Sequence, residues 1–174
     1  MKKAFFYTTP LCEIGIAEEN GAVTNLFFGD SVKPKEYCVE ETPLLREAAR
    51  QLREYFAEKR TVFDFPLRPE GTPFEQSVWN ALLTIPFGET RTYGQIAVQI
   101  GNPKACRAVG GANGKNPIAI VIPCHRVIGA GGKMVGYTAG PTFKETLLKL
   151  EDALPMPDSS ALRKMLYGYV APVI

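Results

Sequence analysis

The chain has 174 residues, of which 45% are hydrophobic, and a formal net charge of +2. This composition excludes a disordered protein and fits one domain or a compact pair of subdomains. No apolar run approaches the length of a membrane-spanning helix, and the N-terminus lacks the apolar stretch of a secretory signal. Four cysteines without a C-x-x-C pair favour a reduced, cytoplasmic protein. With a single histidine, His125, we expect no metal site.

The charge is unevenly distributed along the chain. Residues 1–85 contain ten basic and thirteen acidic side chains, whereas residues 86–136 contain six basic and one acidic, a net charge of +5. Such a segment fits a surface that faces phosphate groups, and it also fits an ordinary solvated face. The charge alone leaves both interpretations open.

Residues 1–68 predict an α/β domain with a small sheet and one helix. Asn20-Gly21 is a hairpin turn signal, and Thr42-Pro43 supplies an N-cap and a first-turn proline. Apolar residues at helical spacing then predict an amphipathic helix over residues 43–58. The predicted strands, runs rich in β-forming residues, are residues 4–8, 11–17, 23–28 and 61–65.

Residues 69–152 predict a mainly helical domain, so the fold class is α+β. Capping boxes at residues 72–75 and 92–95 open two helices, which end before Pro86 and at Gly101. Asn102-Pro103 is expected to cap a third helix over residues 104–112. Two short helices joined by a turn with glycine are typical of a helix-turn-helix, in which small and basic residues suit DNA contact.

An apolar run at residues 118–122 reads as a buried strand that ends in Pro123 and presents Cys124 and His125. A third capping box at residues 142–145 predicts a helix to about residue 152, with Glu151 on its apolar edge. A carboxylate there needs a partner, and His125 is an available one.

Cysteine, histidine and glutamate together suggest an activated thiol. An imidazole can take the thiol proton while a carboxylate orients the ring. Cys124 and His125 are neighbours in the sequence, so their side chains can point apart, and a turn or a bridging water is then needed. The alternative is a small buried cysteine beside a satisfied core histidine.

Residues 120–128, IVIPCHRVI, resemble the active-site signature of the O6-alkylguanine-DNA alkyltransferases, also called methylated-DNA–protein-cysteine methyltransferases. The resemblance covers roughly residues 70–152, whereas residues 1–68 fit the family's N-terminal domain in order and size only. Further matching segments are TPF at 72–74, VW at 78–79, FGE at 87–89, YGQIA at 93–97, GNPK at 101–104, RAVGGA at 107–112, NP at 116–117, GY at 136–137 and KE at 144–145.

The resemblance implies direct, irreversible transfer of an alkyl group from O6 of guanine to Cys124. It implies that His125 is the general base, acting through a water, that Glu151 orients the ring, and that Asn116 braces the turn. Tyr93 matches the tyrosine that serves the flipped base and crowds its phosphate. The thioether is stable, so each molecule acts once, without a cofactor.

The resemblance also implies a monomer that binds alkylated double-stranded DNA in the minor groove, where Arg107 fills the place of the flipped base. The other expected DNA contacts are Lys104, Ala105, Gly110, Gly111 and Ala112. The expected base pocket is formed by Val127, Tyr137, Thr138 and Ala119.

Several features depart from the family pattern. Cys106 stands where alanine is commoner, as a second oxidisable thiol or a small packed residue. Ala119 replaces a proline of some members, which predicts weaker use of bulky benzyl-type substrates. Residues 153–174 extend beyond the common family end, either as a packed segment or as a partner segment.

Rival functions are a non-repairing alkyl-DNA binding module, a Cys-His hydrolase and a helix-turn-helix regulator. The first lacks the cysteine, the second would turn over, and the third would bind one duplex sequence without becoming modified. The sequence leaves open whether O4 of thymine is also a substrate.

Overall fold

The computed structural model describes residues 1–29, 36–133 and 141–152. The described residues form two compact units, one up to Pro69 and one from Glu70 onward. The predicted extension at 153–174 and the predicted pocket residues Tyr137 and Thr138 lie outside the described residues. Within the described part of the chain, no helix has the length and apolar character needed to cross a membrane.

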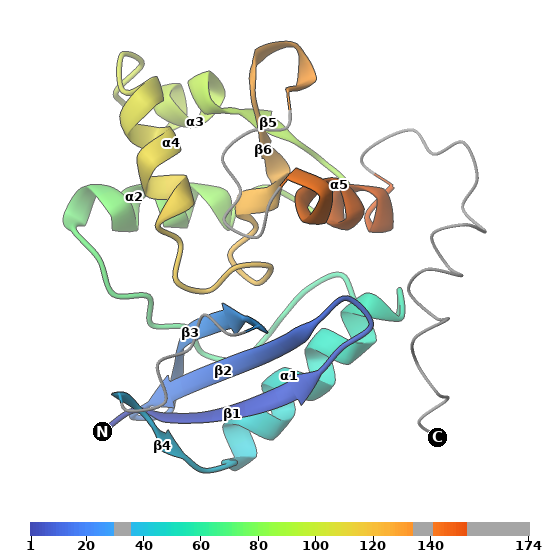
Figure 1. Ribbon diagram of the computed structural model, residues 1–174. Coiled ribbons are helices and arrows are strands. Elements are labelled where there is room, and N and C mark those ends of the chain that lie inside the picture. The colour runs from blue at the N-terminus through green and yellow to red at the C-terminus, as the bar shows by residue number, and fades with distance from the viewer. Residues whose placement is uncertain (30–35, 134–140, 153–174) are drawn as a thin grey trace. The chain divides into compact units, whose positions relative to one another are not determined.

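The first unit is a four-stranded sheet with one long helix beside it (Figure 1). The strand order is β3-β2-β1-β4, with β4 parallel to β1 and the other pairs antiparallel. Asn20 and Gly21 both have positive φ, 52° and 78°, as expected for a tight hairpin turn between β2 and β3. The elements are β1 (Lys3–Thr8), β2 (Glu13–Glu19), β3 (Ala22–Phe28), β4 (Cys38–Val39) and α1 (Pro43–Phe56).

Helix α1 follows the predicted spacing closely. The Thr42 side chain accepts a hydrogen bond from the backbone N–H of Leu45, and Pro43 is in the first turn. The helix contacts β1, β2 and β3. Its buried residues are Leu45, Ala48, Ala49, Gln51, Leu52, Tyr55 and Phe56.

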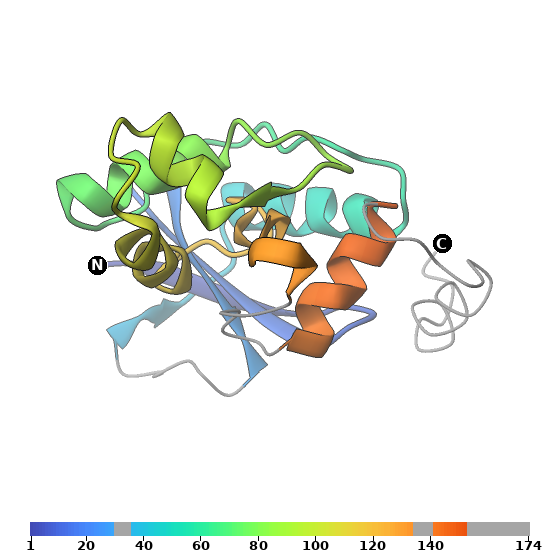
Figure 2. The same cartoon turned by 90° about the horizontal axis from the view of Figure 1, so that it is seen from above.

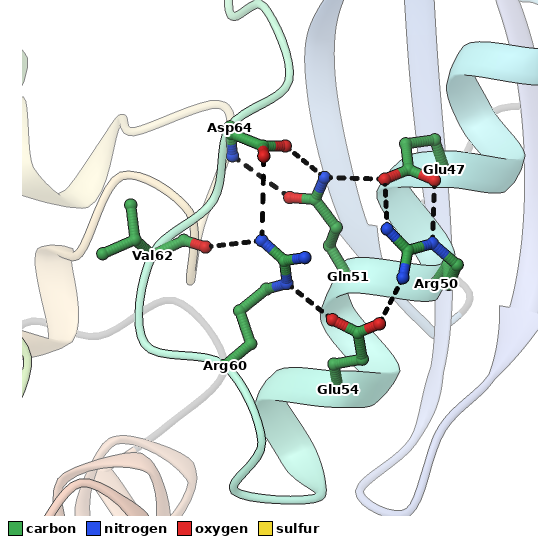
Figure 3. A network of polar contacts seen from close by, with 7 residues as sticks. All are labelled: Glu47, Arg50, Gln51, Glu54, Arg60, Val62 and Asp64. Atoms are coloured by element: carbon green, nitrogen blue, oxygen red, sulfur yellow. Dashed lines mark hydrogen bonds and ion pairs between the residues drawn. The ribbon is translucent and has the colours of Figure 1, made fainter.

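The predicted strand at residues 61–65 is wrong, and a side-chain network explains why (Figure 3). The buried Gln51 side chain accepts from the Asp64 backbone N–H at 3.1 Å, and Arg60 donates to the Val62 carbonyl at 3.0 Å. The Asp64 N–H and the Val62 carbonyl, which a strand would use to pair with its neighbours, are therefore bound by the side chains of Gln51 and Arg60.

The second unit is a group of short helices with a two-stranded parallel ribbon, β5 and β6. Helix α4 packs on α2 and α3, and α5 packs on the 3₁₀ turn η3 (Figure 2). The elements are α2 (Pro73–Leu82), β5 (Arg91–Thr92), α3 (Tyr93–Gln99), α4 (Cys106–Gly114), η3 (Cys124–Arg126), β6 (Val127–Ile128), η4 (Ala130–Gly132) and α5 (Pro141–Leu150).

In the second unit, the predicted capping residues are confirmed at α2 and α3 and are wrong at α4 and α5. The capping boxes of Thr72 with Glu75 and of Thr92 with Gln95 are both complete, which confirms these helix starts. Helix α4 begins at Cys106 rather than 104, and its N-cap Ala105 makes no side-chain capping bond, so Asn102-Pro103 precede the helix as a turn. Helix α5 begins at Pro141, which makes Thr142 its second residue and not its cap.

Candidate active site

The segment that delivers Cys124 is a succession of tight turns, not the predicted strand at 118–122. Ile120 has φ +72° and sits between the Val121 N–H and the Ala119 carbonyl, 2.9 Å apart, as in a γ-turn. Pro123, with φ −82° and ψ 63°, centres a second such turn that closes from the Cys124 N–H to the Ile122 carbonyl at 2.8 Å. A β-branched residue at positive φ is strained by about 1–3 kcal/mol, so the surrounding packing must hold it.

Asn116 holds this turn from both sides. Its Nδ2 donates to the Ile122 carbonyl at 2.8 Å, and its Oδ1 accepts from the Ile118 backbone N–H at 3.0 Å. The bracing role expected for Asn116 therefore has a structural counterpart. Asn113, three residues earlier and within α4, donates from Nδ2 to the Cys124 carbonyl at 3.3 Å.

His125 and Glu151 meet as the sequence predicted. His125 Nε2 and Glu151 Oε1 are 2.8 Å apart, and both side chains are completely buried. Glu151 follows the last turn of α5, where its backbone N–H still bonds the Leu147 carbonyl. The predicted partnership of these two residues is confirmed.

Arg126 is a partner of Glu151 that sequence reasoning missed. Its Nε and one terminal nitrogen donate to the two carboxylate oxygens, each at 2.9 Å, and the other terminal nitrogen donates to the Ile85 carbonyl at 2.7 Å. Burial opposes ionisation of Glu151, but the hydrogen bonds and charges of His125 and Arg126 outweigh it and lower the pKa of Glu151 to about 2. The carboxylate is therefore ionised at neutral pH.

Lys144 of α5 is a second missed residue. It is fully buried, its Nζ donates to the Val127 carbonyl, and its charge lies 5.8 Å from the centre of the Tyr93 ring. Burial lowers the pKa of Lys144 to about 8, and the charge of the Cys124 thiolate opposes part of that shift. Tyr93 opens α3, half-buried, and burial raises its pKa, as do the negative charges of Cys124 and Cys106.

Cys124 is 4% exposed, and burial raises the pKa of its thiol to about 11. The Asn116 side chain and the Lys144 charge act in the opposite direction. Burial also lowers the pKa of His125 more than the Glu151 contact raises it, so the ring is neutral near pH 7. Cys124 is thus a neutral thiol, and the next residue is a neutral imidazole whose protonated form would be stabilised by an ionised carboxylate.

The predicted DNA-contacting residues differ in their exposure to solvent. Lys104, Arg107 and Gly111 are exposed, and Ala105 and Gly110 are half-buried. Ala112 must be removed from this group, because it is 3% exposed and its carbonyl accepts the Trp79 indole N–H at 2.9 Å.

The segment 86–136 exposes fewer positive charges than its net charge of +5 suggests. Arg126, one of its six basic residues, is buried against Glu151. The predicted pocket residues Val127 and Ala119 are buried, at β6 and in the Ile120 turn. Among the described residues, no group of three histidine, cysteine or acidic side chains could hold a metal ion.

Two family models together match most of the chain. The model for the 6-O-methylguanine DNA methyltransferase DNA binding domain matches residues 73–153, and the model for the ribonuclease-like domain of the same proteins matches residues 3–69. The chain belongs to this family. The resemblance seen at residues 70–152 is thus confirmed, and family membership extends to the N-terminal unit.

Individual relatives agree with this family. The methylated-DNA–protein-cysteine methyltransferase of Methanosarcina acetivorans is 65% identical over 148 residues, which cover 83% of this chain and 95% of that protein. The crystal structure of the Mycobacterium tuberculosis O6-methylguanine methyltransferase matches with a TM-score of 0.82 and 44% identity, over 92% of this chain and 99% of that one. The M. tuberculosis protein in complex with DNA matches with a TM-score of 0.81 and 46% identity, over 87% and 93%.

Lys144 and Arg126 carried a weak signal in the sequence. Lys144 lies three and four residues before Leu147 and Leu148, on the apolar stripe of α5, where a charged residue is unusual. Arg126 follows His125 directly, and only the packing of α5 on η3 reveals that both residues reach one carboxylate.

Proposed function

We propose that this protein repairs alkylated DNA by transferring an alkyl group, foremost methyl, from O6 of guanine to the sulfur of Cys124. The observation that carries the proposal is the buried contact of His125 with Glu151 directly beside Cys124, in a chain of the methyltransferase family. The match with a relative solved in complex with DNA supports DNA as the partner, and we infer that the DNA is double-stranded. An alkyl group on O4 of thymine is a second substrate for the same displacement by Cys124.

The reaction begins with removal of the thiol proton, because a thiolate is the nucleophile. His125 accepts that proton through a water, and Glu151 stabilises the resulting imidazolium across the 2.8 Å contact. The sulfur attacks the alkyl carbon in line with the C–O6 bond, whose electron pair leaves with guanine. The thioether product is stable to hydrolysis, so each molecule acts once.

The target carbon is inaccessible inside a duplex, so the base must leave the stack. We assign the vacated place to Arg107, which is exposed on α4, and contact with the flipped base to Tyr93, which is half-buried at the start of α3. Lys104 can contact a phosphate, and the small residues of α4 let this helix approach the minor groove of DNA closely. We place this activity in the cytoplasm and assign it to the monomer.

Intact-mass measurement after incubation with duplex DNA that contains O6-methylguanine tests the proposal. We expect a gain of one methylene mass that maps to Cys124. The gain should disappear in Cys124→Ser and persist in Cys106→Ser, since Cys106 is the exposed thiol of α4. Absence of any gain in the wild-type protein would refute the proposed function.

A further inference from the structure

A buried amide beside the nucleophile has no role in the mechanism above. Asn113 of α4 is 2% exposed, and its Nδ2 donates to the Cys124 carbonyl. That contact fixes which way the amide points, because only the nitrogen can donate. Oδ1 is therefore a buried acceptor, and no donor from the described residues reaches it. An unsatisfied buried carbonyl is costly and requires an explanation.

A second buried acceptor lies on the neighbouring residue. His125 Nε2 contacts Glu151, whose ionised carboxylate can only accept, so Nε2 carries the ring proton and Nδ1 presents a lone pair. Nδ1 also lacks a partner among the described residues. Within that part of the chain, Asn113 Oδ1 and His125 Nδ1 are the two buried side-chain nitrogen or oxygen atoms in this condition. Both belong to residues joined to Cys124, one by a hydrogen bond and one by the chain.

We propose that Asn113 is a positioning residue for alkyl transfer, whose Oδ1 and His125 Nδ1 together hold one water molecule beside the Cys124 thiol. A water has two hydrogens to donate, one for each acceptor, and its oxygen is then left to accept the S–H proton. Buried waters are typically held by two to four such polar groups. The inference rests on the proposed function, because it names the residue that orients that function's proton relay.

The proton transfer balances through this water. The S–H bond breaks as its proton moves to the water, the water gives one proton to Nδ1, and the electron pair on sulfur forms the S–C bond. The imidazolium then donates from Nδ1 to the water, which donates to sulfur and, as before, to Asn113 Oδ1. Asn113 gains and loses no proton, and it fixes one hydrogen of the water in both states.

The test compares Asn113→Leu with Asn80→Leu, the same change at an exposed position of α2. Alkylation of Cys124 by iodoacetamide, followed by mass mapping, needs no DNA. We expect Asn113→Leu to slow it about tenfold at pH 7, the factor that about 1.4 kcal/mol produces, and to raise its pH midpoint. Methyl transfer from damaged duplex should slow in parallel, and Asn80→Leu should remain within about twofold of wild type.

A second variant protects the test against misfolding. Asn113→Asp keeps the shape, and when protonated it offers both an acceptor oxygen and a donor to the Cys124 carbonyl. At pH 6 it should retain alkylation within about threefold of wild type, where the carboxyl's burial keeps it protonated.

Three outcomes bear on the inference. A folded Asn113→Leu protein with the wild-type rate and pH midpoint overturns it. If that variant does not fold, a tenfold loss in folded Asn113→Asp at pH 6 overturns it. Wild-type protein that takes no methyl group from DNA refutes the proposed function instead, and the iodoacetamide comparison still decides the role of Asn113.

Discussion

Each unit of this protein contains an arginine that pairs with carboxylates, but the surroundings differ. In the first unit Arg50 bonds Glu47 and Glu54 on the surface of α1, with 54% of its side chain exposed (Figure 3). In the second unit Arg126 bonds Glu151 with 8% of its side chain exposed, and Glu151 is completely buried. Both arginines bond carboxylate oxygens, and the two sites differ strongly in their exposure to water.

The difference in burial between the two ion pairs indicates which of them serves chemistry and not stability alone. An exposed pair contributes about 0–1 kcal/mol, since water solvates the separated charges almost as well. A buried pair must overcome a desolvation penalty of several kcal/mol per ion, and apolar residues of similar size often stabilise a core better. The buried cluster of His125, Arg126 and Glu151 is consistent with a site that keeps charge because the reaction needs it.

The largest expected contrast comes from replacing each arginine by methionine. Arg126→Met leaves the Glu151 charge buried without its bidentate partner, which should lower the free energy of unfolding by about 3–5 kcal/mol. Arg50→Met should cost far less, because water screens an exposed pair. Urea unfolding of the second unit is followed by fluorescence of Trp79, the chain's single tryptophan, buried in α2. The first unit is followed by amide hydrogen exchange in β2.

Equal losses for the two variants would contradict the comparison. Stabilisation by Arg126→Met would also do so, because it would mean that Glu151 becomes protonated there at no cost.

The next largest contrast is in how the stability of each unit depends on acid pH. The pKa of Glu151 is lowered from 4.5 to about 2, so its contribution is complete above pH 4.5 and is lost as the pH falls toward 2. A shift of this size corresponds to about 3 kcal/mol. We expect the stability difference between wild type and Glu151→Gln to shrink over this window, as measured by Trp79 fluorescence in urea.

Glu47→Gln is the matched control for the acid prediction. Hydrogen bonds from Arg50 and Gln51 lower the pKa of Glu47 to about 2 as well, but this carboxylate lies at the surface. Its effect on stability should change less with pH, because solvent screens it. A larger pH effect from Glu47 than from Glu151 would reverse the proposed order.

Glycine-to-alanine changes offer the smallest contrast. Gly88 and Gly21 both have positive φ, +82° and +78°, so either substitution should cost about 1 kcal/mol in backbone strain. A Cβ on Gly21 meets open space, whereas one on Gly88 comes within 3.2 Å of the Glu151 carbonyl. Gly88→Ala should therefore also slow methyl transfer severalfold, and Gly21→Ala should not. Unchanged transfer in folded Gly88→Ala would show that Glu151 tolerates the displacement.

Features set by local chemistry could be predicted from the sequence. The capping boxes of α2 and α3, the hairpin at Asn20-Gly21 and the apolar stripe that carries Glu151 all depend on neighbours within four residues. The pairing of His125 with Glu151 could also be predicted, because a carboxylate on an apolar helix edge needs a partner and the chain has a single histidine.

Features set by contacts with residues outside the segment concerned could not be predicted. Residues 61–65 have strand composition, but Gln51 takes their backbone N–H. Residues 118–122 are as apolar as a strand, but Asn116 folds them into turns. Arg126 contributes to the positive charge of residues 86–136, and the carboxylate that buries it is 25 residues away in the sequence.

The stoichiometry of methyl transfer tests the central claim most directly. Protein is incubated with excess duplex that contains O6-methylguanine, and both repaired guanine and protein-bound methyl are counted over time. We predict that both reach one equivalent per protein molecule and stop, with the methyl group on Cys124. Guanine repair that continues beyond one equivalent, or a methyl group on another residue, would contradict the account.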